Sequence, residues 1–321
     1  MTRKSIIRFS CAFLLGLGAI APLSAQETRS LPFLEVASDA RSAAMGGSTM
    51  GEARTAYLYT NPTSFLIAEK PIYGSYSFGA YTTKELSGIQ FHALSGGYRL
   101  GTRHAFLVGG RYYKGLHTAK EDEYGERKVL KPMDYSIDVA YAYSFNEHWS
   151  GYVMASFIQS YVGKVAFTGG GSAGLYYRNS LNLQNTPTRY TVGLSVDNIG
   201  GKVQYGKKGY EGNMPGSIAL GGDIFATAFE NVEVGLSMTH RMFFKESNGS
   251  RYMGAVGLEA GFSKKCFIRT GMQIMKDNNA LTLGAGYLWN TWKPIMFDLT
   301  YRKGLNNSGF DSLWAGISIG I

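Results

Sequence analysis

Ten charged side chains stand at alternating positions within otherwise apolar stretches, and they are the residues best placed to form a functional site. These residues are Asp138, Arg189, Asp197, Asp223, Glu233, Arg241, Glu259, Arg269, Asp298 and Arg302. Opposite charges facing each other on neighbouring strands contribute roughly 0.2–1 kcal/mol per pair. A selective pore more often carries a ring of one sign. The mixed signs therefore favour a structural polar network over a solute path, which remains the alternative.

The sequence offers no pattern for catalysis or for metal and nucleotide binding. The histidines lack the HExxH spacing of a zinc site, and each is interpreted as an inward-facing or loop residue. They are His92, His104, His117, His148 and His240. The run Gly169-Gly170-Gly171 lacks the Lys-Ser/Thr pair of a phosphate loop, so it predicts a flexible loop tip. We expect no enzyme, no metal and no cofactor.

The elements that must position the charges are fourteen runs of period-two alternation. Their bounds are 71–82, 86–99, 103–114, 133–146, 149–163, 172–181, 188–199, 215–226, 230–243, 251–262, 266–275, 279–290, 293–302 and 311–321. A barrel strand that crosses a bilayer needs about 9–11 residues, whereas soluble strands usually have about five or six. The runs therefore have the length of membrane strands.

Each run separates two faces. In the run from 279, Leu281, Leu283 and Tyr287 fall on one face, while Thr282 and Gly284 fall on the other. A soluble sandwich that buries its apolar face produces the same alternation, so this pattern alone does not distinguish the two folds.

The connections between runs alternate in length. Gaps after odd-numbered runs include 115–132, 200–214 and 303–310, while those after even-numbered runs include 100–102 and 147–148. Bacterial outer-membrane barrels have long extracellular loops and short periplasmic turns. Residues 71–321 are therefore predicted to form an all-β fold, a 14-stranded antiparallel transmembrane outer-membrane β-barrel. A secreted sandwich is the alternative.

The composition favours the same fold class. Charged residues make up 17% of the 321 residues, below the roughly 25% of soluble domains, while Gly contributes 42 and aromatic residues 14%. Gly disfavours helices, and aromatic residues suit strands. The net charge of +9 is scattered along the chain rather than clustered, which argues against a nucleic-acid partner.

The first 25 residues have the three parts of a secretory signal peptide. Arg3, Lys4 and Arg8 precede an apolar run over 11–20, and small residues at 23–25 form a cleavage site. The mature chain would then begin near Gln26 and travel to the outer membrane. Its single cysteine, Cys266, cannot form an internal disulfide.

Residues 26–70 are predicted to form a plug. Ser38 or Asp39 caps a helix over 40–45 that ends at Gly46 and Gly47, and a second helical pattern over 52–59 stops at Asn61 and Pro62. Eight strands already enclose just enough space for their own side chains. Fourteen strands leave room for such a segment, which we expect at the periplasmic mouth.

Two motifs in this segment resemble a known family. The nonapeptide DARSAAMGG includes Asp39, Arg41, Met45, Gly46 and Gly47, and the tetrapeptide YTNP ends in Asn61 and Pro62. Both resemble the opening of the PorV/PorQ family, which is itself similar to FadL-type barrels. Thr63 stands where the family usually has Ala. Residues 192–205 and 214–215 resemble the mid-barrel strands and loop of the family.

This resemblance implies a role in type IX secretion. PorV-like members escort substrates that bear a conserved C-terminal domain from the translocon to the surface-attachment machinery, and PorQ-like members belong to that machinery. The expected partners are outer-membrane lipid, secreted cargo proteins and secretion-system subunits. The charged stretch 120–128 is either a partner contact or a solvated loop. A FadL-like channel for hydrophobic small molecules and a purely structural outer-membrane protein remain alternatives.

Overall fold

The computed structural model describes residues 29–121, 127–183, 186–206, 210–247, 250–276, 278–290, 292–305 and 310–321. The predicted signal peptide, residues 1–25, lies outside these ranges. In the described part of the chain, none of the helices is both long and apolar enough to cross a membrane.

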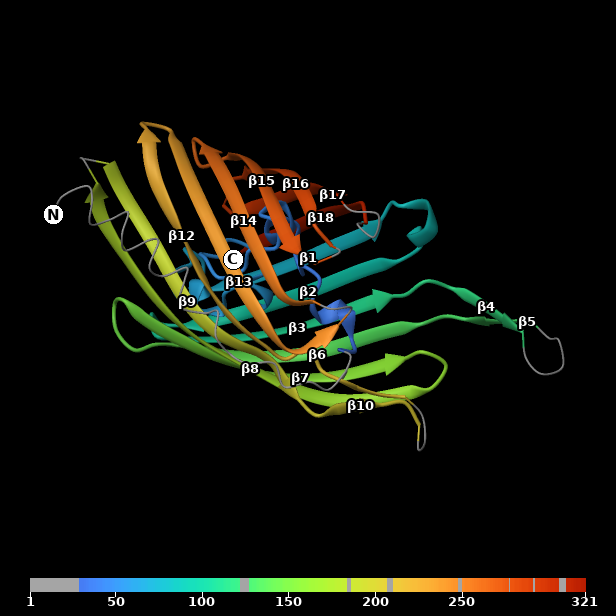
Figure 1. The fold of residues 1–321 in the computed structure, drawn as a ribbon. Helices are drawn as coiled ribbons and strands as arrows, with labels where there is room; N and C mark the ends of the chain where they lie inside the picture. Colours follow the sequence, from blue (N-terminus) through green and yellow to red (C-terminus); the bar gives the residue numbers. More distant parts are fainter. Residues whose placement is uncertain are drawn as a thin grey trace.

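Fourteen antiparallel strands of the described chain close into a barrel (Figure 1). They are β1 (Ile72–Tyr81), β2 (Gln90–Leu100), β3 (His104–Lys114), β6 (Met133–Ser144), β7 (Trp149–Tyr161), β8 (Val165–Leu183), β9 (Thr186–Gly200), β12 (Ser217–Phe229), β13 (Val232–Ser247), β14 (Ser250–Phe262), β15 (Cys266–Met275), β16 (Ala280–Trp289), β17 (Ile295–Gly304) and β18 (Ser312–Gly320). Each pairs with its neighbours along the chain, and β1 pairs with β18 in the register Tyr73↔Gly320 to close the ring. The predicted fold class is confirmed.

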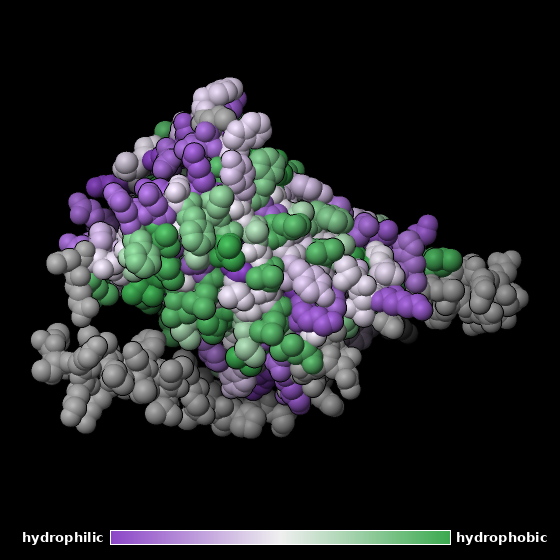
Figure 2. Space-filling model, turned by 90° about the horizontal axis from the view of Figure 1, so that it is seen from above, coloured by the Kyte–Doolittle hydropathy of each residue, from purple (hydrophilic) through white to green (hydrophobic). Residues whose placement is uncertain are grey.

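The wall has an apolar outer face and a packed inner face. Leu283 is 61% exposed, whereas its neighbour Thr282 is 4% exposed. Figure 2 shows hydrophobic side chains gathered over the middle of the barrel wall and hydrophilic ones towards the edges of this view. An apolar band bounded by polar ends is the pattern of a barrel in lipid. Tyr287, Trp289 and Trp292 are exposed beside one periplasmic turn, where an aromatic girdle is expected.

The long connections form small ribbons at one end of the barrel. β4 (Thr118–Glu121) pairs with β5 (Arg127–Leu130), and β10 (Lys202–Gln204) pairs with β11 (Glu211–Asn213). A short 3-10 turn, η4 (Lys84–Leu86), lies on the same side. This is the extracellular end, because bacterial barrels place long loops outside and short turns in the periplasm. The β4–β5 ribbon projects well beyond the wall in Figure 1.

One predicted loop is wrong. Residues 164–171 were expected to connect two strands, with Gly169–Gly171 as a flexible tip. Instead β8 begins at Val165 and carries these glycines within the strand, paired with β7. The partner strand supplies their backbone hydrogen bonds, so the absence of side chains does not end the strand here.

The plug contains one α-helix and three 3-10 turns. They are η1 (Pro32–Leu34), α2 (Ala40–Ala44), η2 (Tyr57–Tyr59) and η3 (Pro62–Ile67). The expected helix over 40–45 is present, and Asp39 caps it by accepting the Ser42 backbone N–H at 2.9 Å. The expected helix over 52–59 is wrong, because only its last three residues form a 3-10 turn.

Close backbone approaches hold α2 against the wall. A Cβ at Gly271 would lie 2.3 Å from the Gly46 nitrogen, and one at Gly257 would lie 2.7 Å from the Met45 Cβ. Gly46 itself has φ +70°, a left-handed conformation that suits glycine after a helix. Glycines in the plug and in the wall together let a short helix touch the strands directly.

The plug runs along the lumen rather than only across its periplasmic mouth. Arg29 donates to the carbonyls of Lys245 and Ser250, at the extracellular ends of β13 and β14. The last plug residues lead into β1, which begins at Ile72 on the periplasmic side. Residues 26–70 were expected as a periplasmic or lumenal plug, and the first described residues of the plug extend to the extracellular end.

Candidate functional site

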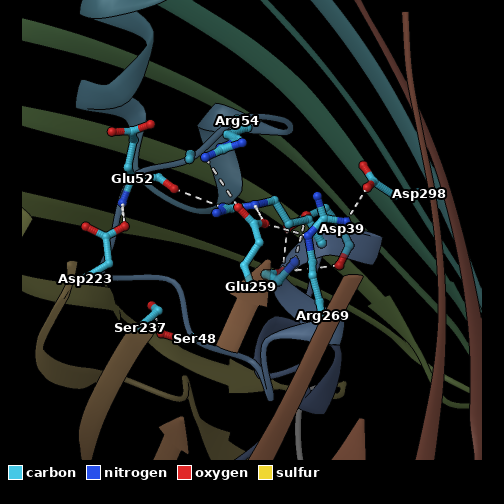
Figure 3. A network of polar contacts seen from close by, with 12 residues as sticks. Asp39, Ser48, Glu52, Arg54, Asp223, Ser237, Glu259, Arg269 and Asp298 are labelled. Atoms are coloured by element: carbon cyan, nitrogen blue, oxygen red, sulfur yellow. Dashed lines mark hydrogen bonds and ion pairs between the residues drawn. The ribbon is translucent and has the colours of Figure 1, made fainter. Parts of the chain in front are cut away.

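A charged cluster at mid-height joins the plug to three strands (Figure 3). The Nε atom of Arg269 donates to Glu259 Oε2 at 2.6 Å, and its Nη1 donates to Asp298 Oδ1 at 2.6 Å. Arg41 of the plug donates from Nε to the same Glu259 oxygen at 3.0 Å. Glu259 and Arg269 are almost fully buried. Arg41 and Arg269 share the Glu259 carboxylate, so loss of that buried charge would weaken the attachment of the plug to the wall.

A second cluster lies beside the first and also includes plug residues. Arg54 donates from Nη2 to Glu233 Oε2 at 2.6 Å and lies 3.4 Å from Glu259 Oε1, which links the two clusters. Arg189 pairs with Glu233 and with Glu52. The Glu52 backbone N–H donates to Asp223 Oδ2 at 2.5 Å. The charges of the wall are thus matched to those of the plug.

Two further ion pairs lie nearer the extracellular end. Arg111 donates to Asp138 Oδ1 at 3.0 Å, and the hydroxyl of the plug residue Tyr59 donates to Asp138 Oδ2 at 3.0 Å. Arg241 donates to Asp197 Oδ2 at 2.9 Å. Arg302, the last of the ten predicted residues, donates instead to the Phe310 carbonyl and the Asn278 side chain. The structure therefore gathers the ten residues into several groups, not into one cross-strand network.

The residues of the plug motif shape the plug and its contact with the wall. Asp39 caps α2, Met45 packs on Gly257, and Gly47 has φ +86°. Asn61 accepts the Thr63 backbone N–H at 3.1 Å, and Pro62 begins η3.

Threonines of the wall complete the hydrogen bonding of α2. Thr300 donates to the Ala40 carbonyl at 2.6 Å, and Thr282 donates to the Ala44 carbonyl at 2.7 Å. Backbone N–H groups of residues 45–47 already bond the carbonyls of Arg41, Ser42 and Ala43. The barrel adds hydrogen bonds at the first and last residues of the helix.

Burial also changes the titration of plug residues. It raises the pKa of the Asp39 carboxyl above its ordinary value, with hydrogen bonds from Ser42 opposing the shift. Burial, assisted by the nearby Glu52 charge, raises the pKa of the Tyr57 phenol to about 12. Tyr57 therefore stays protonated at neutral pH.

Sequence reasoning missed three charged residues of these groups: Glu52, Arg54 and Arg111. The inward face of Arg111 could have been predicted from the sequence, because it alternates with Phe106, Val108 and Tyr112, which face outward. The plug residues follow no two-residue alternation, so their partners depend on how the plug enters the lumen.

The interpretation of the histidines is wrong for three of the five. His92, His104 and His240 lie on the outward face near the barrel ends, among exposed aromatic residues. His92 Nδ1 lies 2.8 Å from the Tyr76 hydroxyl, and His104 Nδ1 lies 2.7 Å from the Tyr141 hydroxyl. Imidazole is amphipathic enough to join the aromatic girdle at the lipid–water boundary. Within the described residues, no His, Cys, Asp or Glu group could hold a metal ion.

Two cavities flank the charged clusters. The outer chamber, about 460 Å³, lies on the extracellular side and includes Arg302, Phe310 and Trp314 in its lining. The inner chamber, about 510 Å³, lies at the periplasmic side and includes Arg54, Arg189 and Lys264. The plug and its ion pairs lie between them.

The family model described as type IX secretion system protein PorV matches residues 24–243. The chain belongs to the PorV family. The PorV-family barrel is thus a bacterial outer-membrane protein. Among curated proteins, none matches the sequence.

Two solved structures share the fold of this PorV-family chain. One is the Ralstonia pickettii toluene transporter TbuX, with a TM-score of 0.56 and 14% identity over 88% of this chain and 97% of that one. The other is the Pseudomonas putida toluene transporter TodX, with a TM-score of 0.56 and 13% identity over 92% and 99%. At such identities the likeness extends to the fold alone.

Proposed function

We propose that this PorV-family barrel is a non-enzymatic component of type IX secretion that binds secreted proteins at its extracellular face, as a cargo shuttle or attachment factor. The observation that carries the proposal is the plug, whose described residues 29–70 run along the lumen and are braced by buried ion pairs. A barrel whose lumen is filled by its own plug is suited to bind a partner at its extracellular surface.

The size of the free space supports this proposal. Cavities of about 460 and 510 Å³ match small molecules, whose pockets typically measure about 300–1,000 Å³. A folded domain of 100 residues has a radius of gyration of about 13 Å. A folded cargo domain must therefore bind outside the lumen.

The two extracellular ribbons are not equivalent as binding surfaces. Val203 and Tyr205, in and just after β10, are buried, and the Ser30 backbone N–H of the plug donates to the Asn213 carbonyl at 2.8 Å. The β10–β11 ribbon is therefore part of the packed mouth. The β4–β5 ribbon projects freely, with Val129 exposed, and is the better candidate for a cargo contact.

Deleting residues 118–130 tests the proposal. We expect the shortened barrel to stay folded, with a heat-modifiable band on gels, and to lose crosslinking to secreted proteins in cells. The matched control neutralises Lys264 and Lys265 at a periplasmic turn, as Lys264→Gln with Lys265→Gln, and should leave crosslinking unchanged. Retained crosslinking after the deletion would count against the ribbon as the cargo contact. Absence of crosslinks in the unaltered protein would overturn the function.

The second candidate function is a FadL-like channel for hydrophobic small molecules. Its support is the outer chamber, where Trp314, Met253 and Met275 line part of the wall, and the shared fold with proteins described as toluene transporters. In that case, removing residues 31–50 should change uptake of an apolar solute, whereas the 118–130 deletion should not. A structural protein would show neither effect.

A further inference from the structure

The arginines that line the outer chamber differ in how their charge is balanced. Arg111 is paired with Asp138 at 3.0 Å, and Arg241 is paired with Asp197 at 2.9 Å. Arg302 has no carboxylate within ion-pairing distance among the residues that the structure describes. The Asp311 carboxylate, which lies close enough to act on the charge of Arg302, pairs with Lys303 at 2.8 Å. Arg302 is therefore held without an ion pair of its own.

The hydrogen bonds of Arg302 leave donors available. Its Nη1 donates to the Phe310 carbonyl at 2.6 Å, and its Nη2 donates to Asn278 Oδ1 at 2.7 Å. Both acceptors are neutral. A guanidinium has five N–H donors in a planar fork, so three remain. Two neutral contacts fix the orientation of the group without neutralising it, which is the state of a preorganised anion site.

The other residues that line the chamber indicate which kind of molecule would bring the anion. Around Arg302, the chamber combines the aromatic ring of Trp314 with the amides and hydroxyls of Gln273, Asn278 and Ser312. Asn278 Oδ1 already accepts from Arg302, Ser312 Oγ accepts from Trp314 Nε1, and Gln273 Nε2 donates to the Asn278 carbonyl. Each of these groups therefore already has a partner, and it is the free donors of Arg302 that call for a carboxylate. The ion pairs of Glu259 lie on the periplasmic side of the chamber, so an occupant reaches it from the extracellular side, where a secreted protein would be bound.

We propose that the outer chamber binds an acidic residue of a secreted protein, with Arg302 contacting the carboxylate. This inference rests on the proposed function, because it names the part of the cargo that enters the barrel. A folded domain remains outside, and only an extended segment inserts.

A fluorescent peptide tests the site in the purified, detergent-solubilised full-length protein. The probe is a dansyl tetrapeptide amide whose only carboxylate is one glutamate side chain, compared with its glutamine analogue. We expect the glutamate peptide to bind about tenfold more tightly, the difference associated with one charge-assisted contact. Arg302→Gln should abolish that preference, and Arg302→Lys should restore part of it.

The matched control is Lys265→Gln, which removes an exposed cation at a periplasmic turn, outside the lining of the outer chamber. It should keep the full preference for the glutamate peptide. Equal binding of the two peptides to the unaltered protein, or a preference that survives Arg302→Gln in a heat-modifiable barrel, would overturn the inference. Competition by free phenylacetate as strong as that by the peptide would assign the site to a free organic acid and overturn the assignment to cargo.

Crosslinking in cells separates this inference from the proposed function. If cargo contributes the carboxylate, Arg302→Gln should lower crosslinking several-fold while Lys265→Gln leaves it unchanged. Crosslinking that depends on residues 118–130 but not on Arg302 would overturn the chamber inference and leave the function standing. Loss of all crosslinking in the unaltered protein would overturn the function, while the peptide measurement would still report on Arg302.

Discussion

Arg41 of the plug helix donates to Glu259 of β14 across the lumen at 3.0 Å, and Arg269 of the neighbouring strand donates to the same oxygen. One carboxylate therefore accepts from a plug cation and a wall cation. Because Glu259 is shielded from solvent, its charge depends on these partners and on Arg54, which lies 3.4 Å from its Oε1. Glu259 is thus one of the side chains that couple the plug to the barrel.

Glu259→Gln should destabilise the protein strongly. The variant leaves Arg41 and Arg269 buried without their shared anion, and breaking a buried pair in this way costs about 3–5 kcal/mol. The measurement is the free energy of unfolding in detergent by denaturant titration. Glu211→Gln is the control, since its partner Lys202 is exposed and such pairs contribute about 0–1 kcal/mol. Similar losses in both variants would contradict the coupling.

Gly271→Val should displace the plug helix. The new Cβ would lie 2.3 Å from the Gly46 nitrogen, and overpacking of this kind costs about 1–3 kcal/mol. Gly254→Val is the matched control, because its Cβ would point outward with the nearest atom 3.7 Å away. Protease sensitivity of the plug in detergent, read by mass spectrometry, should rise for the first variant only. An unchanged digestion pattern would argue against tight contact.

Leu283→Arg should place a charge in lipid. Near the bilayer midplane this substitution costs about 2–4 kcal/mol. Its inward neighbour Thr282 is no control, because it is buried and donates to the Ala44 carbonyl, so Arg would clash with the plug. Gln273→Arg, which lines the outer chamber, is the appropriate comparison and should cost less. Folding into lipid vesicles measures both, and equal losses would refute the assigned facing.

Asp39→Asn should alter the dependence of stability on pH. Burial raises the pKa of Asp39, so the folded chain binds this proton more tightly than the unfolded chain. Its stabilising contribution is complete below about pH 3.9 and is lost as pH rises through the folded pKa. Asn keeps the helix cap but does not titrate. The variant should gain stability relative to the parent as pH rises above about 4 in denaturant titrations, and a constant difference would contradict the shift.

The sequence by itself determined the barrel wall. The fourteen alternating runs match the observed strands, and residues such as Leu283 and Thr282 face as their alternation predicts. The helix N-cap at Asp39 was also predicted from the sequence. These features are local: a strand repeats every two residues, and a cap involves a few neighbours, so the sequence pattern contains them directly.

Only the tertiary structure decided the route of the plug and the partners of its charges. Arg41 and Glu259 are 218 residues apart, and their contact exists only because the closed barrel brings β14 beside α2. The histidines show the same limit, since the alternation gives the outward face of His92, His104 and His240 but not their depth, and depth decides whether an outward side chain joins the aromatic girdle. Long-range pairing and membrane depth are properties of the closed barrel, and no short stretch of sequence specifies them.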